Sequence, residues 1–166
     1  SEFIKFDADV VFDVKILRQL VDSDHANVLC IDQNIALEDE EVEVITDYHM
    51  QVLEVGKTVD PKLALGESIG IEKISAKTGP LLFAEFAAMM ESKKLLQDYY
   101  EAAYARLVQK GTVFRALNFT GLDWAEIDTA EDFAAANAML ESPISTILRG
   151  QQKAVDDAAE KAGTLA

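Results

Sequence analysis

Asn27-Val28-Leu29-Cys30-Ile31 is the stretch that decides the fold, because it is short and almost continuously apolar. Runs of this kind form strands that are buried on both faces of a sheet. Cys30 fits such a strand as a small core residue rather than as a nucleophile. It is the chain's one cysteine, so an intramolecular disulfide is excluded and a reducing compartment is expected. The run therefore predicts a strand in the middle of the core.

Strands and helices alternate on both sides of this run. Ile4 to Phe12 alternates in hydropathy and predicts one strand, followed by a helix over residues 13–21. The further elements expected are a β-hairpin (42–55), a strand broken by Gly70 (67–75), helices (80–93, 97–110, 129–140) and strands (112–119, 124–127). This order indicates a mixed α/β domain over residues 1–142 and a helical or frayed tail over residues 143–166.

The composition is strongly acidic, with 15 Lys and Arg against 30 Asp and Glu in 166 residues and a net charge of −15. Nucleic-acid phosphates would be repelled, so we expect no nucleic-acid partner. Two possibilities stay open: a solvated acidic surface, or a site that binds a divalent cation. The acidic run Glu38 to Glu43 is expected to be a solvated loop or edge. No stretch resembles a membrane span or a signal peptide, so a cytoplasmic protein without a membrane partner is expected.

Two pairs of carboxylates occur at predicted strand ends. Asp7 and Asp9 are two residues apart, and an extended chain would point both side chains the same way. Glu126 and Asp128 repeat this spacing just before a predicted helix. Such carboxylates suit Mg²⁺, which binds carboxylate oxygens together with substrate phosphates and water. The alternatives are a solvent-facing strand end for the first pair and helix capping for the second.

Other polar residues give weaker signals. Lys57 lies in a predicted loop where its ammonium can meet a phosphate, although most exposed lysines do not. Glu67 and Gly70 fit either ligand recognition or a plain strand bulge. Tyr100 and Tyr104 share one helix face, which is typical of core residues. The two histidines lie in separate predicted turns, so neither a catalytic triad nor a zinc site is supported.

Together these segments resemble the later half of the sugar-phosphate type of nucleotidyltransferases, and most of all the small cytidylyltransferases of the phosphocholine and aminoethylphosphonate kind. The resemblance spans residues 4–140 and rests on four motifs in matching order: Asp7-Ala8-Asp9-Val10-Val11-Phe12-Asp13, Gly56-Lys57, Gly66-Glu67-Ser68-Ile69-Gly70-Ile71 and Trp124-Ala125-Glu126-Ile127-Asp128-Thr129-Ala130-Glu131-Asp132. It implies a partial doubly wound, Rossmann-like fold. It also implies that Asp9 and Asp128 hold Mg²⁺, with Asp7 and Glu126 as further metal candidates, and that Lys57 and Glu67 lie near the acceptor phosphate.

The reaction that the resemblance implies is attack of a phosphate or phosphonate monoester, such as phosphocholine, on the α-phosphorus of CTP, with release of pyrophosphate. Ala8 stands where the family usually has glycine. The glycine-rich, basic loop that binds the triphosphate in the family is not found in these 166 residues, which hold eight glycines and no cluster of them. We therefore expect the chain alone to be inactive, with a homo-oligomer or another chain completing the sheet. The alternative is a non-catalytic remnant of the fold that serves as an oligomeric or binding module.

Overall fold

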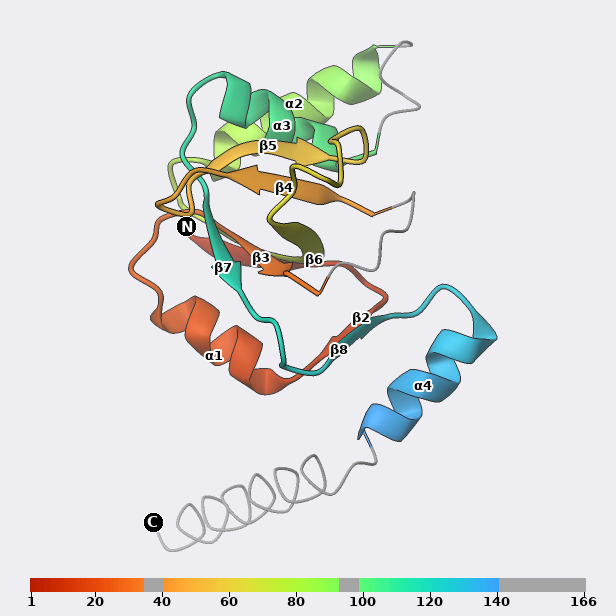
Figure 1. The fold of residues 1–166 in the computed structure, drawn as a ribbon. Helices are drawn as coiled ribbons and strands as arrows, with labels where there is room; N and C mark the ends of the chain where they lie inside the picture. Colours follow the sequence, from red (N-terminus) through yellow and green to blue (C-terminus); the bar gives the residue numbers. More distant parts are fainter. Residues whose placement is uncertain (35–40, 93–98, 141–166) are drawn as a thin grey trace, which may run out of the picture.

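The computed structural model describes residues 1–34, 41–92 and 99–140. Its elements, drawn in Figure 1, are β1 (Phe3–Phe6), β2 (Val10–Phe12), α1 (Val14–Asp22), β3 (Val28–Asp32), β4 (Glu43–Thr46), β5 (Val52–Gly56), β6 (Gly66–Ile74), α2 (Gly79–Glu91), α3 (Glu101–Gln109), β7 (Arg115–Asn118), β8 (Trp124–Glu126) and α4 (Ala130–Leu140). This alternation confirms the predicted mixed α/β class.

The main sheet is built around β6. Within the described residues its strand order is β5-β4-β6-β3-β7, and β1 pairs with β6 as well. Strand β6 runs antiparallel to β3 along one side; on the other side its start pairs with β4 and its end with β1. Strands β3 and β7 are parallel. Every residue of β3 is buried, which confirms that the apolar run around Cys30 forms a strand covered on both faces.

The turn of the β4–β5 hairpin pairs with the start of β7, the strand at the other end of the sheet. Gln51 forms an antiparallel bridge with Arg115 at the start of β7. Two backbone hydrogen bonds accompany it: Val52 N donates to the Phe114 carbonyl (3.0 Å), and Ala116 N donates to the Met50 carbonyl (2.8 Å). The last strand of the sheet therefore has a partner on both sides at its beginning, which reduces the exposed edge.

Hydrophobic cores lie on both faces of the main sheet. Helices α2 and α3 cover one face, and α1 and the small β2–β8 ribbon cover the other (Figure 1). Tyr104 of α3 is buried against Phe114, with ring centroids 5.8 Å apart in an edge-on arrangement. This confirms Tyr104 as a core residue. Ile16 and Leu20 are the buried residues of α1, which packs on the second face.

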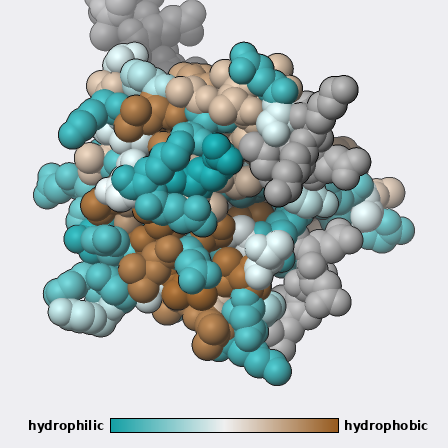
Figure 2. All heavy atoms as spheres, turned by 90° about the horizontal axis from the view of Figure 1, so that it is seen from above, coloured by the Kyte–Doolittle hydropathy of each residue, from teal (hydrophilic) through white to brown (hydrophobic). Residues whose placement is uncertain are grey.

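Apolar groups also reach the surface on the side of α2 and α3 (Figure 2). Phe83 and Met90 of α2 are 62% and 75% exposed. The homo-oligomer expected from the sequence stays a prediction. No helix of the described part of the chain is long and apolar enough to cross a membrane.

Two predictions about the strands are wrong. Residues 4–12 form not one strand but β1 and β2, which belong to different sheets, because the chain turns at Ala8 and Asp9. Glu43 is not a solvated end of an acidic run: it begins β4 and is 2% exposed, because its strand is paired on both sides. The tail over residues 143–166 and residues 38–40 of the acidic run lie outside the described residues.

Candidate functional site

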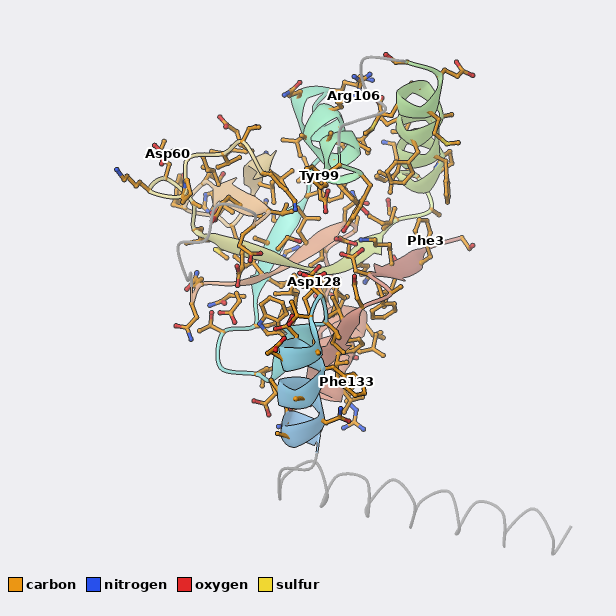
Figure 3. All side chains as sticks on the ribbon, turned by 90° about the vertical axis from the view of Figure 1, so that its right-hand side faces the viewer. Phe3, Asp60, Tyr99, Arg106, Asp128 and Phe133 are labelled. Carbon is orange, nitrogen blue, oxygen red and sulfur yellow. The ribbon has the colours of Figure 1, made fainter. Side chains whose placement is uncertain are left out.

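The β2–β8 ribbon brings three carboxylates together. Val10 pairs with Glu126, and the ladder continues where Ile127 N donates to the Asp9 carbonyl (3.1 Å). Asp9, Glu126 and Asp128 are all exposed, and one carboxylate oxygen of each lies within 4.8 Å of the others. Figure 3 shows Asp128 where the chain enters α4. The expectation that Asp9 and Asp128 lie close together is therefore met.

These three side chains have the geometry for a hard divalent cation. Mg²⁺ and Ca²⁺ bind carboxylate oxygens at about 2.1 and 2.4 Å, so two oxygens on one ion can be about 4 to 5 Å apart. Burial raises the pKa of Glu126, and the neighbouring charges of Asp128 and Asp9 raise it further. A cation would relieve this repulsion, so the donor set fits such an ion.

The capping role at the start of α4 belongs to other residues than Asp128. Asp132 Oδ2 accepts hydrogen bonds from the Thr129 backbone N–H and hydroxyl, both at 2.8 Å, and from Asp128 N (3.2 Å). Thr129 Oγ1 accepts in return from Asp132 N (3.2 Å). This reciprocal pair is the predicted capping box, and it leaves the Asp128 carboxylate facing Asp9 and Glu126.

Asp7 does not join the three carboxylates. Because the chain turns after it, Asp7 and Asp9 do not point the same way, contrary to the sequence prediction. The Asp7 carboxylate accepts hydrogen bonds from Lys5 Nζ and from the Tyr100 hydroxyl, both at 2.6 Å. Lys5 Nζ also lies 3.3 Å from buried Glu72 and 3.8 Å from the centroid of the Tyr100 ring. Asp7 is thus fixed in a half-buried network between β1, β6 and α3.

The Asp7 side chain lies so close to the backbone of residue 70 that only glycine fits there. The φ of Gly70, +70°, lies in the left-handed region, and a Cβ added to this residue would lie 2.2 Å from Asp7 Oδ2. Asp7 N donates to the Gly70 carbonyl (2.9 Å), and the register between β3 and β6 shifts at this level. Of the two explanations offered for Gly70, the strand bulge is the one observed, and it makes room for a side chain.

A small cavity opens between Asp7 and the carboxylate group. Its charged lining residues are four acids and one lysine: Asp7, Glu41, Glu101, Glu126 and Lys57. Tyr100, two valines and residues of β6 complete the lining. Lys57 Nζ lies over the Tyr99 ring, 4.1 Å from its centroid, so its ammonium is held by an aromatic face. The structure thus brings Lys57, Asp7 and Glu126 to one cavity.

Glu67 lies apart from this cavity, in a row of buried acids across three strands. It is directly opposite Asp32 of β3 and Glu43 of β4, so the three side chains share one face of the sheet. Burial, followed by the charges of Glu41, Asp32, Glu43 and Glu126, raises the pKa of Glu67 to about 7. Both carboxylate oxygens of Glu43 are buried without a hydrogen-bond partner among the described residues.

Asp32 has no predicted role, although it directly follows the apolar run 27–31 and ends β3. Burial raises the pKa of Asp32, but hydrogen bonds outweigh this and the net pKa is lowered. The donors are Trp124 Nε1 (2.8 Å) and Thr120 Oγ1 (2.7 Å). Ligands bind at the carboxyl ends of parallel strands in open α/β sheets. The position of Asp32 at the end of β3, beside the parallel strand β7, could therefore have marked it as a candidate site residue.

Known proteins were compared with the chain in sequence and in structure. No family model and no curated protein matches it. Solved structures do match. The inositol-1-phosphate CTP transferase from T. maritima aligns at 17% identity and a TM-score of 0.62, over 85% of this chain and 57% of that one. The CTP:phosphocholine cytidylyltransferase from Streptococcus pneumoniae aligns at 15% and 0.62, over 83% and 57%.

A third match is a putative glucose-1-phosphate thymidylyltransferase from Bacillus anthracis, at 14% identity and a TM-score of 0.58, covering 83% of this chain and 54% of that one. The chain thus spans between 54% and 57% of the length of these structures. At such low identities the likeness shows the fold. The chain shares the Rossmann-like mixed α/β fold of these nucleotidyltransferases.

Proposed function

We propose that this chain provides the metal-binding and acceptor-binding part of a nucleotidyltransferase that transfers a cytidylyl group from CTP to a phosphate or phosphonate monoester. The observation that carries the proposal is the group of Asp9, Glu126 and Asp128, with oxygens within 4.8 Å of one another. It lies next to a cavity that holds Lys57. The fold shared with solved nucleotidyltransferases supports it.

The three carboxylates would hold Mg²⁺. When bound, the ion supplies charge neutralisation at the α-phosphate of the nucleotide. An oxygen of the acceptor phosphate would attack the α-phosphorus while the bond to the leaving pyrophosphate breaks. The task of this chain is then to position the acceptor and to stabilise charge, and it needs no covalent intermediate on a side chain.

The lining of the cavity favours an acceptor with a phosphate at one end and a cation at the other. Lys57 is the basic group available to the phosphate, and its ammonium is oriented by the Tyr99 ring. Four lining residues are acidic, and their charge attracts an ammonium group. Phosphocholine and aminoethylphosphonate have this chemistry. Glu67 lies outside the cavity lining, and we propose that it acts through charge on Glu126 rather than by contact.

The chain by itself is proposed to be inactive. The 166 residues contain no glycine cluster that could bind a triphosphate, and a net charge of −15 opposes a ligand of like sign. A misplacement of the reacting phosphate by about 1 Å can cost about a hundredfold in rate. Metal binding and catalysis are therefore separate claims, and they need separate experiments.

The metal claim is tested with Mn²⁺ in place of Mg²⁺, by the paramagnetic broadening of amide signals in NMR spectra. Broadening is expected around residues 9 and 126–128, with competition by Mg²⁺. Asp128→Asn should weaken Mn²⁺ binding at least tenfold, because one of three carboxylate ligands is lost. The matched control is Asp22→Asn, an exposed aspartate on α1. Broadening that is spread over the acidic surface, or unchanged in Asp128→Asn, would refute the metal site and favour the non-catalytic alternative.

The catalytic claim is tested by pyrophosphate release from CTP with Mg²⁺ and either phosphocholine or aminoethylphosphonate. No turnover is expected from the 166-residue chain alone. Turnover that disappears in Asp128→Ala would show that the chain binds the triphosphate through residues to which we give no such role.

A further inference from the structure

A second cavity, of about 660 Å³, lies at the opposite end of the main sheet from the carboxylates. Its walls include Asn27 just before β3, Ser75 just after β6 and Arg115 at the start of β7. The acidic end of the sheet is marked by Asp32, where β3 ends, and by Glu67, near the start of β6. Asn27 and Asp32 are five positions apart along β3, which at about 3.3 Å each places them about 16 Å apart.

The charge of this cavity is the reverse of that of the whole chain. Its lining includes Lys77, Lys110 and Arg115 against one acidic residue, Asp24. The full sequence has twice as many acidic as basic residues. Basic side chains are thus enriched in the lining of this cavity relative to the whole sequence.

Two of the basic groups are held in place by fixed contacts. Lys110 pairs with Glu85 of α2, which also accepts a hydrogen bond from Arg106 Nε (2.6 Å). Arg115 Nη1 donates to the His49 carbonyl (2.8 Å), which leaves its other guanidinium nitrogens for a ligand. Lys77 is exposed and has no ion pair among residues 1–34, 41–92 and 99–140, so its charge is not neutralised there.

The floor of the cavity is already formed. Asn27 donates from Nδ2 to the Val113 carbonyl (3.0 Å) and accepts at Oδ1 from Ser75 N (3.0 Å). The Ser75 hydroxyl bonds to the buried Thr78 hydroxyl (3.1 Å). Thr78 precedes α2, whose first turn carries no acidic residue and no side-chain cap. The positive end of the α2 dipole adds to the field of the three basic side chains.

We propose that this cavity is a binding site for an anion of the phosphate class, separate from the carboxylate group. It combines a floor fixed by hydrogen bonds, enough volume for a phosphorylated small molecule, and three basic side chains, of which Lys110 is shared with Glu85 and Lys77 has no ion pair among the described residues. The proposal is independent of the proposed cytidylyl transfer, because Asp9, Glu126 and Asp128 are not among the residues that line this cavity.

The experiment is a titration of the ¹⁵N-labelled chain with inorganic phosphate, without divalent cations, at constant ionic strength maintained with chloride. We expect saturable shifts of the amides of residues 77–79 and 111–113 with a dissociation constant in the millimolar range, about −4 kcal/mol. Lys77→Gln should weaken binding about twofold to fivefold, the size expected for one exposed ion pair. Lys77 is exposed, so this variant is expected to fold.

Two matched variants separate the alternatives. Lys62→Gln removes an exposed lysine from another loop and should leave phosphate binding unchanged. Asp128→Asn should also leave it unchanged, which distinguishes this site from the carboxylate group. Shifts that do not saturate, that are strongest elsewhere, or that are the same in Lys77→Gln would overturn the proposal.

Discussion

Replacing Glu67 by glutamine tests whether the row of buried acids destabilises the folded chain at neutral pH. Glu67 is 9% exposed and lies opposite Asp32 and Glu43. Burial and the neighbouring acidic charges raise its pKa from the usual 4.5 to about 7. Glutamine has nearly the same shape and no charge, so it keeps the packing and removes the cost of ionisation.

The sign and the size of the effect follow from the two pKa values. Below pH 4.5 the folded and unfolded states both hold the proton, and the carboxylic acid costs little. Between 4.5 and about 7 only the folded state holds it, so the stability of the wild type falls as the pH rises. At about 1.36 kcal/mol per pH unit, the full loss is about 3 kcal/mol. Glu67→Gln should escape this loss.

The assay is urea unfolding of wild type and Glu67→Gln from about pH 5.5 to about pH 8, a range above the sequence pI of 4.4. The variant should be more stable throughout, and its advantage should grow by about 2 kcal/mol across this range. The control Glu54→Gln, on the exposed side of β5, should change stability by less than about 0.5 kcal/mol at every pH. An advantage of Glu67→Gln that is absent or independent of pH would refute the raised pKa.

Three further changes have defined outcomes. Gly70→Ala should lower the free energy of unfolding by about 2 to 4 kcal/mol, because alanine is strained at φ +70° and its Cβ would displace the Asp7 carboxylate; urea unfolding measures this, and a neutral result would contradict the close approach. Thr129→Ala should cost about 1 kcal/mol by removing the cap of α4, and hydrogen exchange should be faster in α4 but not in α1. Glu85→Gln should cost about 1 to 2 kcal/mol at neutral pH by weakening the contacts with its two basic partners on and after α3. Because these partners lower the pKa of Glu85, the cost should shrink as the pH falls through that lowered pKa; a cost that stays constant in acid would rule the ion pairs out as its source.

The local patterns of the sequence were sufficient for most of the fold. The apolar run around Cys30, the alternation in the β4–β5 hairpin and the Thr129–Asp132 capping box each depend on near neighbours in the chain. The division between β1 and β2 does not. Alternation continues across Asp7-Ala8-Asp9, and the turn is stabilised by contacts of Asp7 with Gly70 and Tyr100, which are distant in sequence.

In the candidate site, too, some features could be predicted from the sequence and others could not. The closeness of Asp9 and Asp128 followed from a resemblance in motif order, and the structure agrees. The position of Asp7 in a network with Lys5 and Tyr100 was not predictable, because it depends on Tyr100, which is 93 residues away in the sequence. Glu43 was missed because an acidic run is usually solvated, whereas here pairing on both sides buries its first strand residue.

The position of all three clustered carboxylates on the β2–β8 ribbon has a mechanical consequence. Asp9, Glu126 and Asp128 lie on or next to a two-stranded ribbon that is separate from the main sheet, whereas Lys57 and Glu67 move with the main sheet or its loops. The ribbon carries the three carboxylates together, and its own contacts hold it against the main sheet: Trp124 Nε1 donates to Asp32 Oδ2 (2.8 Å), and Val10 and Phe12 pack against the buried cluster on that face. The distance from the carboxylates to Lys57 is therefore set by how the ribbon packs on the sheet, whereas the spacing among the carboxylates is set within the ribbon and the turn that follows it. A substitution at Trp124 would change the first distance and leave the second unchanged.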